Sequence, residues 1–148
     1  MNYKFIEHTA DIGFEAYGNS YGMLLKNSYS ALFSIMCYVK RIKHRVSEGL
    51  EKPLSYEFSL EDKDISYLLW RSLQESISQS DAEAVFFYSA EAISLKGSET
   101  GFKVDITLMG VPKRPEFAKL DVKSMTFYNF SIGRSKTGLL TLTAIVDI

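Results

Sequence analysis

Residues 139–148 read LLTLTAIVDI, and the alternation of apolar and polar side chains in this segment predicts a β-strand with one buried face. The apolar set occupies every second position from Leu140 to Val146. Because successive side chains of a strand point to opposite faces, Asp147 is expected on the face opposite to that set. The segment therefore predicts a sheet whose last strand ends in an acidic residue.

Working outward from this strand, much of the remaining chain also has the features of strands bounded by turns. The expected strands are residues 3–6, 12–16, 56–60, 84–88, 92–96, 102–108, 120–132 and 139–147. Turns are expected at residues 97–101 and 133–138, where glycine is combined with serine, threonine and charged residues.

Two segments show the period of 3.6 residues that is typical of an amphipathic helix. The first covers residues 20–35 and begins at Ser20, a residue type that caps helices. The second covers residues 65–77 and follows Ser59 and Asp62, whose spacing resembles a capping box. Both helices are expected to present one apolar face to a sheet.

With helices early and strands late, the element order predicts an α+β fold, specifically a two-layer sandwich of a mixed, mostly antiparallel sheet with two main helices. The order is not the strict alternation of a Rossmann-like sheet. Residues 97–101 lack the Lys-Ser/Thr ending of a phosphate-binding loop. Since no repeat or linker divides the chain, a single domain spanning residues 1–148 is expected.

Composition restricts the function classes that the chain can serve. Its 148 residues are 46% hydrophobic with a net charge of −1, so the protein as a whole has no basic field that would draw it onto nucleic acid. The single cysteine, Cys37, excludes an intramolecular disulfide and is expected to be buried in an apolar run. Two histidines are too few for a Cys/His zinc site. No apolar run approaches the length of about 18 residues that spans a membrane, and a cytoplasmic protein without membrane contact is expected.

Residues 40–45 read KRIKHR and form the only dense basic run. They lie in the polar segment 40–52, which is expected to be a loop. Such a run can contact phosphates. It can equally be a solvated helix end, where positive charge favours the helix C-terminus. The sequence leaves both interpretations open.

Carboxylates stand at the two ends of the chain. Residues 7–13 read EHTADIG and place Asp11 in a segment typical of a turn, while Asp147 stands beside the carboxylate of Ile148. Adjacent negative charges repel unless solvent, a basic side chain or a cation separates them. Ca²⁺ accepts such oxygen ligands in flexible geometry, whereas Mg²⁺ requires a stricter octahedron. An ordinary turn and a solvated chain terminus are the alternative interpretations.

Three further residues are candidate supports of this site. His8 could orient the turn through a hydrogen bond, and Thr9 could cap local backbone amides. Lys123 is either a functional cation or an exposed strand lysine. No residue is predicted to be catalytic.

The two end motifs, residues 7–13 and 146–148, together resemble the archease family, and the similarity extends over nearly the full chain. The family's opening Glu-His-Thr-Ala-Asp-(Ile/Val)-Gly is intact, and its closing hydrophobic strand ends in Asp-Ile as this chain does. Internal segments similar to other family motifs are residues 31–33, 62–70 and 123–126.

The chain departs from the family pattern in its second half. The pair Phe127 and Tyr128 stands where the family usually has an aromatic residue followed by histidine. The preceding loop, residues 111–117, lacks the histidine that the family tends to carry there. These departures leave Asp11 and Asp147 unaffected.

The resemblance implies a protein that is not itself an enzyme but activates the GTP-dependent tRNA-splicing RNA ligase. Archeases promote guanylylation of this ligase, permit repeated turnover and broaden its nucleotide use, and tRNA is then reached indirectly through the ligase. Carried over to this chain, the family's metal ligands are Asp11, Asp147 and Ile148. The expected ion is Ca²⁺, with Mg²⁺ or another divalent cation as the alternative.

Two other function classes are kept as hypotheses. The first is a chaperone-like modulator of a tRNA-modifying enzyme such as a methyltransferase, which co-purification of partners would identify. The second is a metal-dependent hydrolase with His8 as its base, although catalytic metal sites usually show more ligands and a clear base. Turnover of phosphoesters by the isolated protein would identify the hydrolase.

Overall fold

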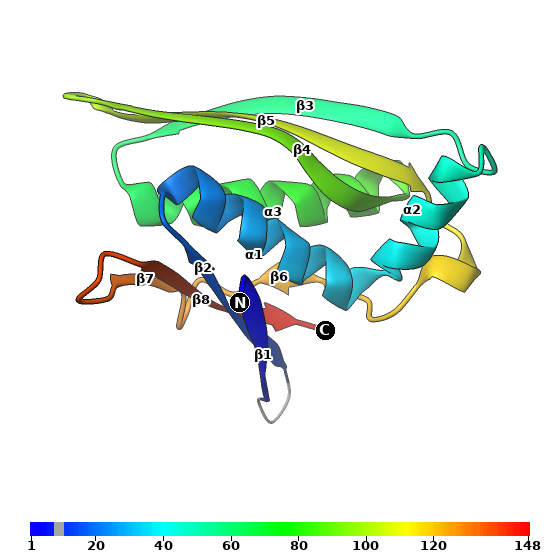
Figure 1. The fold of residues 1–148 in the computed structure, drawn as a ribbon, viewed down its shortest axis with the longest axis horizontal. Coiled ribbons are helices and arrows are strands. Elements are labelled where there is room, and N and C mark those ends of the chain that lie inside the picture. Colours follow the sequence, from blue (N-terminus) through cyan, green and yellow to red (C-terminus); the bar gives the residue numbers. More distant parts are fainter. Residues whose placement is uncertain (8–10) are drawn as a thin grey trace.

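The computed structural model describes residues 1–7 and 11–148 and arranges them as two antiparallel sheets with two long helices between them (Figure 1). The first sheet contains β1 (Tyr3–Glu7), β2 (Ile12–Gly18), β8 (Leu140–Asp147) and β6 (Ser124–Met125) in that order, with β7 (Ser131–Arg134) also paired to β8. The second sheet has the order β3 (Leu54–Asp62), β5 (Gly101–Pro112) and β4 (Val85–Ser98). The helices are α1 (Tyr21–Met36), α2 (Val39–Ser47), α3 (Ile65–Glu83) and the 3₁₀ turn η1 (Pro115–Phe117).

The α+β class is confirmed, but the expectation of one sheet in a two-layer sandwich is wrong. Helix α1 contacts β2 of the first sheet and β4 of the second, so the helices form a middle layer (Figure 1). The reason is that the buried residues of α1 occupy more than half of its circumference, with Lys26 and Ser30 on the remaining exposed side, and so wide a buried face must be covered on more than one side. Its fully buried side chains include Leu24, Leu25, Tyr29 and Leu32.

Local signals place the starts of both long helices. Helix α1 begins after Ser20, whose hydroxyl accepts a hydrogen bond from the Met23 amide at 3.1 Å, as predicted. Helix α3 is capped instead by Asp64, whose carboxylate accepts from the Tyr67 amide at 3.0 Å. The predicted capping box of Ser59 and Asp62 is wrong, because β3 continues through both residues.

Helix α3 extends beyond the predicted residue 77 to Glu83. Its last turns contain serines rather than large apolar residues, and the apolar period therefore stops early. Ser76 and Ser80 are buried, and their hydroxyls donate to the carbonyls of Leu73 and Val85 at 2.6 Å each. These hydrogen bonds allow polar side chains to occupy a helix face inside the protein.

Three other expectations require correction. The predicted loop 40–52 contains α2, because Val39, Ile42 and Val46 share one helix face and pack against a small apolar cluster. The separate strands 84–88 and 92–96 are the single strand β4, in which register shifts replace the expected break. Segment 120–132 forms β6 and β7 with a loop between them, in which Asn129 has a φ of 65°.

The turn predicted at residues 97–101 is confirmed, since β4 and β5 meet there as a hairpin.

Among the residues that the structure describes, no helix is long and apolar enough to cross a membrane.

We predict that Gly18→Ala destabilises the protein, because an added Cβ would lie 2.5 Å from the Leu24 nitrogen and 2.8 Å from its Cα. These are backbone atoms of α1, so relief requires the helix to shift from β2. The free energy of unfolding should fall by about 1–3 kcal/mol. Gly133→Ala is the matched control, because nothing lies within 4 Å of its added Cβ. Urea denaturation measures both, and equal stability of the two variants would contradict the proposed helix–strand contact.

Candidate functional site

The two acidic residues singled out in the sequence come together at one edge of the first sheet. Strands β2 and β8 pair antiparallel from Gly18–Leu140 to Ile12–Val146. Asp11 directly precedes this last pair and Asp147 directly follows it, so continuing the register by one residue sets them opposite each other. Asp11 is partly buried and Asp147 is exposed. The pairing therefore brings carboxylates from distant parts of the sequence to one place.

Strand β6 holds the end of β8 from its other side. Ser124 pairs with Asp147, and the Lys123 amide donates to the Asp147 carbonyl at 2.8 Å. Thr126 donates to the Ile145 carbonyl through both its amide, at 3.0 Å, and its hydroxyl, at 2.9 Å. The end of β8 is thus hydrogen-bonded on both edges, unlike the loose terminus that was the alternative interpretation.

Of the three candidate supporting residues, the structure describes Lys123. His8 and Thr9 lie outside the described residues. The Lys123 side chain is exposed immediately before β6, and its backbone amide is the atom that contacts Asp147. Ile148 is 39% exposed next to Asp147.

The donor set fits a hard divalent cation. Asp11 and Asp147 supply carboxylate oxygens, and Ile148 has main-chain oxygens beside them, which are the ligand types that Ca²⁺ and Mg²⁺ prefer. Within residues 1–7 and 11–148, no three His, Cys, Asp or Glu side chains are grouped for a metal. A cation at this edge would therefore need main-chain oxygens or water to complete its coordination.

A cluster of aromatic side chains lies beside β6, next to this edge. Tyr67 and Trp70 of α3 stack with ring centroids 5.7 Å apart, and Phe127 packs edge-on against both. The Trp70 indole donates to the Met125 carbonyl at 3.1 Å, which joins the cluster to the strand that holds Asp147. We call Tyr67, Trp70 and Phe127 the aromatic cluster.

The aromatic cluster is a feature that the sequence did not reveal. Phe127 is 58% exposed and its neighbour Tyr128 is 81% exposed. The expected strand 120–132 would have buried alternate residues of this segment, whereas Trp70 is partly buried against the core. The sequence signal that could have located the aromatic cluster is the adjacent pair Phe127 and Tyr128, which lies in the loop between β6 and β7.

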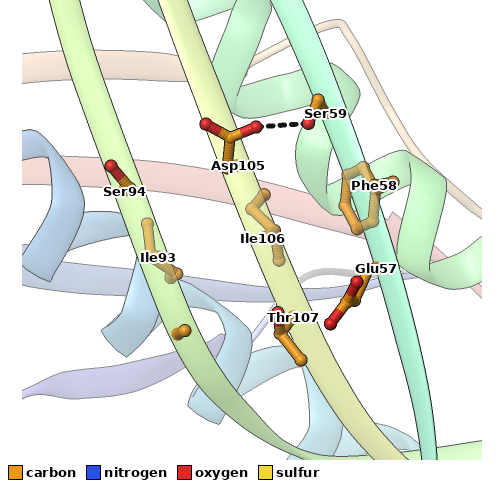
Figure 2. Close-up of a pocket in the computed structure, with 9 residues that line it drawn as sticks. Glu57, Phe58, Ser59, Ile93, Ser94, Asp105, Ile106 and Thr107 are labelled. Atoms are coloured by element: carbon orange, nitrogen blue, oxygen red, sulfur yellow. Dashed lines mark hydrogen bonds between the residues drawn. The ribbon is translucent and has the colours of Figure 1, made fainter.

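A second candidate site is a shallow depression of about 400 Å³ on the second sheet (Figure 2). It spans β3, β5 and β4, and a hydrogen bond from the Ser59 hydroxyl to Asp105 crosses it. None of the predicted site residues lines it. Glu57 and Asp105 make it acidic, and their side chains are exposed to solvent.

Cys37 is unsuited to nucleophilic chemistry. Its side chain is fully buried, and its thiol lies 3.4 Å from the Phe33 carbonyl oxygen and 3.6 Å from that of Phe87. Burial raises the pKa of the thiol to about 12, although nearby Lys119 acts in the opposite direction. The thiolate, which is the reactive form, is therefore scarce at neutral pH.

Comparison with known proteins identifies a family whose model matches nearly the whole chain. Residues 3–148 match the model of the Archease protein family (MTH1598/TM1083). A protein archease of Archaeoglobus fulgidus is 30% identical over 149 residues, covering 100% of both chains. One from Pyrococcus abyssi is 28% identical over 144 residues, covering 96% of this chain and 95% of the relative.

Two solved structures share the fold. The solution structure of Methanobacterium thermoautotrophicum protein 1598 superposes with a TM-score of 0.79 at 23% identity, covering 99% of each chain. A Thermotoga maritima crystal structure, described as an archease and possible chaperone, gives a TM-score of 0.65 at 18% identity. It covers 98% of this chain and 96% of the other.

We predict that Cys37 resists thiol reagents in the folded protein. At pH 7.5, Ellman's reagent should react negligibly with the native chain and with one equivalent after unfolding in guanidinium, because folding both buries the thiol and raises its pKa. The control is the same assay on a Cys37→Ala variant, which should show no reaction in either state. Rapid reaction of the native thiol would contradict the buried position.

Proposed function

The chain belongs to the archease family, and we propose that it activates the GTP-dependent tRNA-splicing RNA ligase by promoting guanylylation of that ligase. The observation that carries the proposal is the β2–β8 pairing, which sets Asp11 and Asp147 at one edge of the first sheet. On this proposal the chain is a protein cofactor that allows the ligase to turn over repeatedly with a broader range of nucleotides.

The proposed cation is Ca²⁺, with Mg²⁺ as the alternative. Asp11, Asp147 and a main-chain oxygen of Ile148 would hold the cation. The hydrogen bond from the Lys123 amide, directly before β6, to the Asp147 carbonyl would keep Asp147 in place. When bound, a divalent cation supplies positive charge that stabilises phosphate oxygens. Asp11 comes from the start of β2 and Asp147 from the end of β8, so the site would depend on the first sheet being intact.

The ligase is proposed to contact the aromatic cluster. Tyr67 and Phe127 are 41% and 58% exposed, and exposed aromatic groups on a protein surface mark interaction sites. Because the Trp70 indole is hydrogen-bonded to β6, a partner bound there would also lie next to Asp147. We call the end of the first sheet at which Asp11 and Asp147 lie the acidic edge. Aromatic contacts would then position the ligase, and the acidic edge would promote its reaction with GTP.

A chaperone-like role is the second candidate, favoured by the description of the Thermotoga maritima structure as a possible chaperone. The aromatic cluster could bind an exposed apolar segment of a tRNA-modifying enzyme such as a methyltransferase. Suppression of that enzyme's aggregation, without any effect on a ligase, would favour this role. Hydrolysis of phosphoesters by the isolated protein would instead favour the metal-dependent hydrolase.

We predict that the protein accelerates guanylylation of its cognate ligase without itself becoming labelled. Radiolabelled GTP, ligase and a stoichiometric amount of this chain are mixed, and label on the ligase is followed with time. Asp11→Ala should remove the acceleration because it removes one proposed cation ligand. Asp81→Ala, an exposed carboxylate on α3, is the matched control and should retain it.

Circular dichroism accompanies this assay. Cooperative melting of Asp11→Ala near the wild-type temperature, together with loss of the acceleration, supports a functional carboxylate. Unfolding of the variant would show that Asp11 is structural. Label on this chain, or an unchanged rate with the wild-type protein, would refute the activator role.

We predict that the chain binds Ca²⁺ through its last two residues. Asp147→Asn and a tag attached after Ile148 should each weaken binding about tenfold or more, since the first removes a negative charge from the proposed ligand set and the second crowds it. The same tag placed before Met1 is the control and should leave the affinity nearly unchanged. Calorimetric titration compares the four proteins, and equal affinities would remove Ile148 and Asp147 from the site.

A further inference from the structure

Helix α2 and the segment after β5 form a positively charged surface that shares no residue with the proposed cation site. The two lie side by side, with η1 in contact with α2 (Figure 1). We call this the basic surface and define it by these residues: Lys40, Arg41, Lys43, Arg45, Lys113, Arg114 and Lys119.

Charge in the chain is strongly separated. Residues 38–52 and 112–119 together hold eight lysines and arginines against three glutamates. The rest of the chain holds nine lysines and arginines against fifteen carboxylates, out of totals of 17 and 18. The net charge of −1 therefore conceals a basic end on an otherwise acidic protein, and such local fields attract partners of opposite charge.

The basic surface rests on an apolar base. Ile42 is fully buried, and it forms a cluster with Phe117 and Phe86, so α2 keeps one face against the protein. Lys40 and Lys43 lie on exposed positions of the same helix. The helix thus presents its charges outward from a fixed support.

Two arginines of the surface form ion pairs with one buried carboxylate, and Arg114 is also hydrogen-bonded to it. The side chain of Glu51 is 2% exposed, and its Oε1 accepts from Arg114 Nε at 2.6 Å. Arg45 Nε lies 3.7 Å from the same oxygen. The hydrogen bond from Arg114 to Glu51 raises the pKa of Arg114. Because the Glu51 side chain is buried beneath the two arginines, a partner that binds the surface would contact the arginines and not the carboxylate.

Tyr38 fixes two further cations. Arg41 lies over its ring at 4.4 Å from the centroid, and Lys119 lies at 5.0 Å. Arg41 also donates to the Glu116 carbonyl at 2.6 Å, which ties α2 to η1. Cations held in place in this way lose less side-chain entropy when they bind an anion.

We propose that the basic surface binds the phosphodiester backbone of RNA. The choice of RNA over an acidic protein rests on the proposed function, in which the partner is an RNA ligase. Lys119 is four residues from Lys123, whose amide contacts Asp147, so these two Cα atoms are at most about 14 Å apart. RNA bound at Lys119 would therefore lie near the acidic edge, and its ends would be delivered to the ligase.

The test is binding of a fluorescent single-stranded RNA 20-mer to the protein alone, measured by anisotropy at 50 mM and 200 mM KCl. Wild-type affinity should fall steeply with salt, since counterions are released from each phosphate that is neutralised. Charge reversal of Lys40→Glu with Lys43→Glu should weaken binding about tenfold or more. The salt slope should also fall by about 1.4, which is about 0.7 for each of the two phosphates that these lysines no longer neutralise.

The matched control is Lys96→Glu with Lys103→Glu, which makes the same change in net charge. These two lysines pair across β4 and β5 and are exposed on the second sheet. The control should bind RNA within about twofold of wild type, since the number of neutralised phosphates, rather than the net charge, sets the affinity. Equal weakening by both double variants, or no binding at 50 mM KCl, would overturn the proposal. Tighter binding of polyglutamate than of RNA would also overturn it, in favour of an acidic protein.

Failure of the activator role is detected separately. Guanylylation of the ligase by GTP involves no RNA, so wild-type protein that binds RNA but does not accelerate guanylylation would refute the activator role alone. If both hold, the Lys40→Glu, Lys43→Glu variant should raise the KM for RNA ends in complete ligation. An unchanged KM in a variant that no longer binds RNA would refute delivery of RNA by this surface.

Discussion

The burial of α1 between β2 and β4 is the constraint on which the rest of the structure depends. A helix with so wide a buried face is not covered by a single sheet, because part of its apolar surface would remain in water. The chain resolves this by building a sheet on each side, one from its ends and one from its middle. The first sheet covers α1 from one side. The pairing of β2 with β8 within that sheet also brings Asp11 and Asp147 together at the acidic edge.

Sequence patterns predicted the elements better than their arrangement. The α+β class, the beginning of α1 at Ser20 and the final strand through Asp147 follow from local periodicity and capping. The second sheet does not, because a period of two defines a strand but not the sheet to which it belongs. Helix α2 was hidden by its composition, since its basic residues outnumber the few apolar side chains that bury one face.

The candidate site was predictable to a similar degree. Asp11 and Asp147 stood out as acidic residues, but only the pairing register of β2 with β8 places them at one edge. The aromatic cluster was not predictable, because Tyr67, Trp70 and Phe127 meet across helix and loop, and each alone is compatible with a buried position. Pairing between distant segments is not encoded in any local window, which is why these surfaces required the structure.

The position of β8 also has a consequence for biosynthesis. Strand β2 is made early, whereas β8, its partner, is made only after the helices and the second sheet. Until then β2 has an open edge, and contacts between segments far apart in sequence form slowly. The helices and the second sheet can fold first, because their contacts close shorter loops. The acidic edge is therefore assembled late in folding, and a chain that stops before β8 would lack both that edge and the cover that β8 gives to one side of α1.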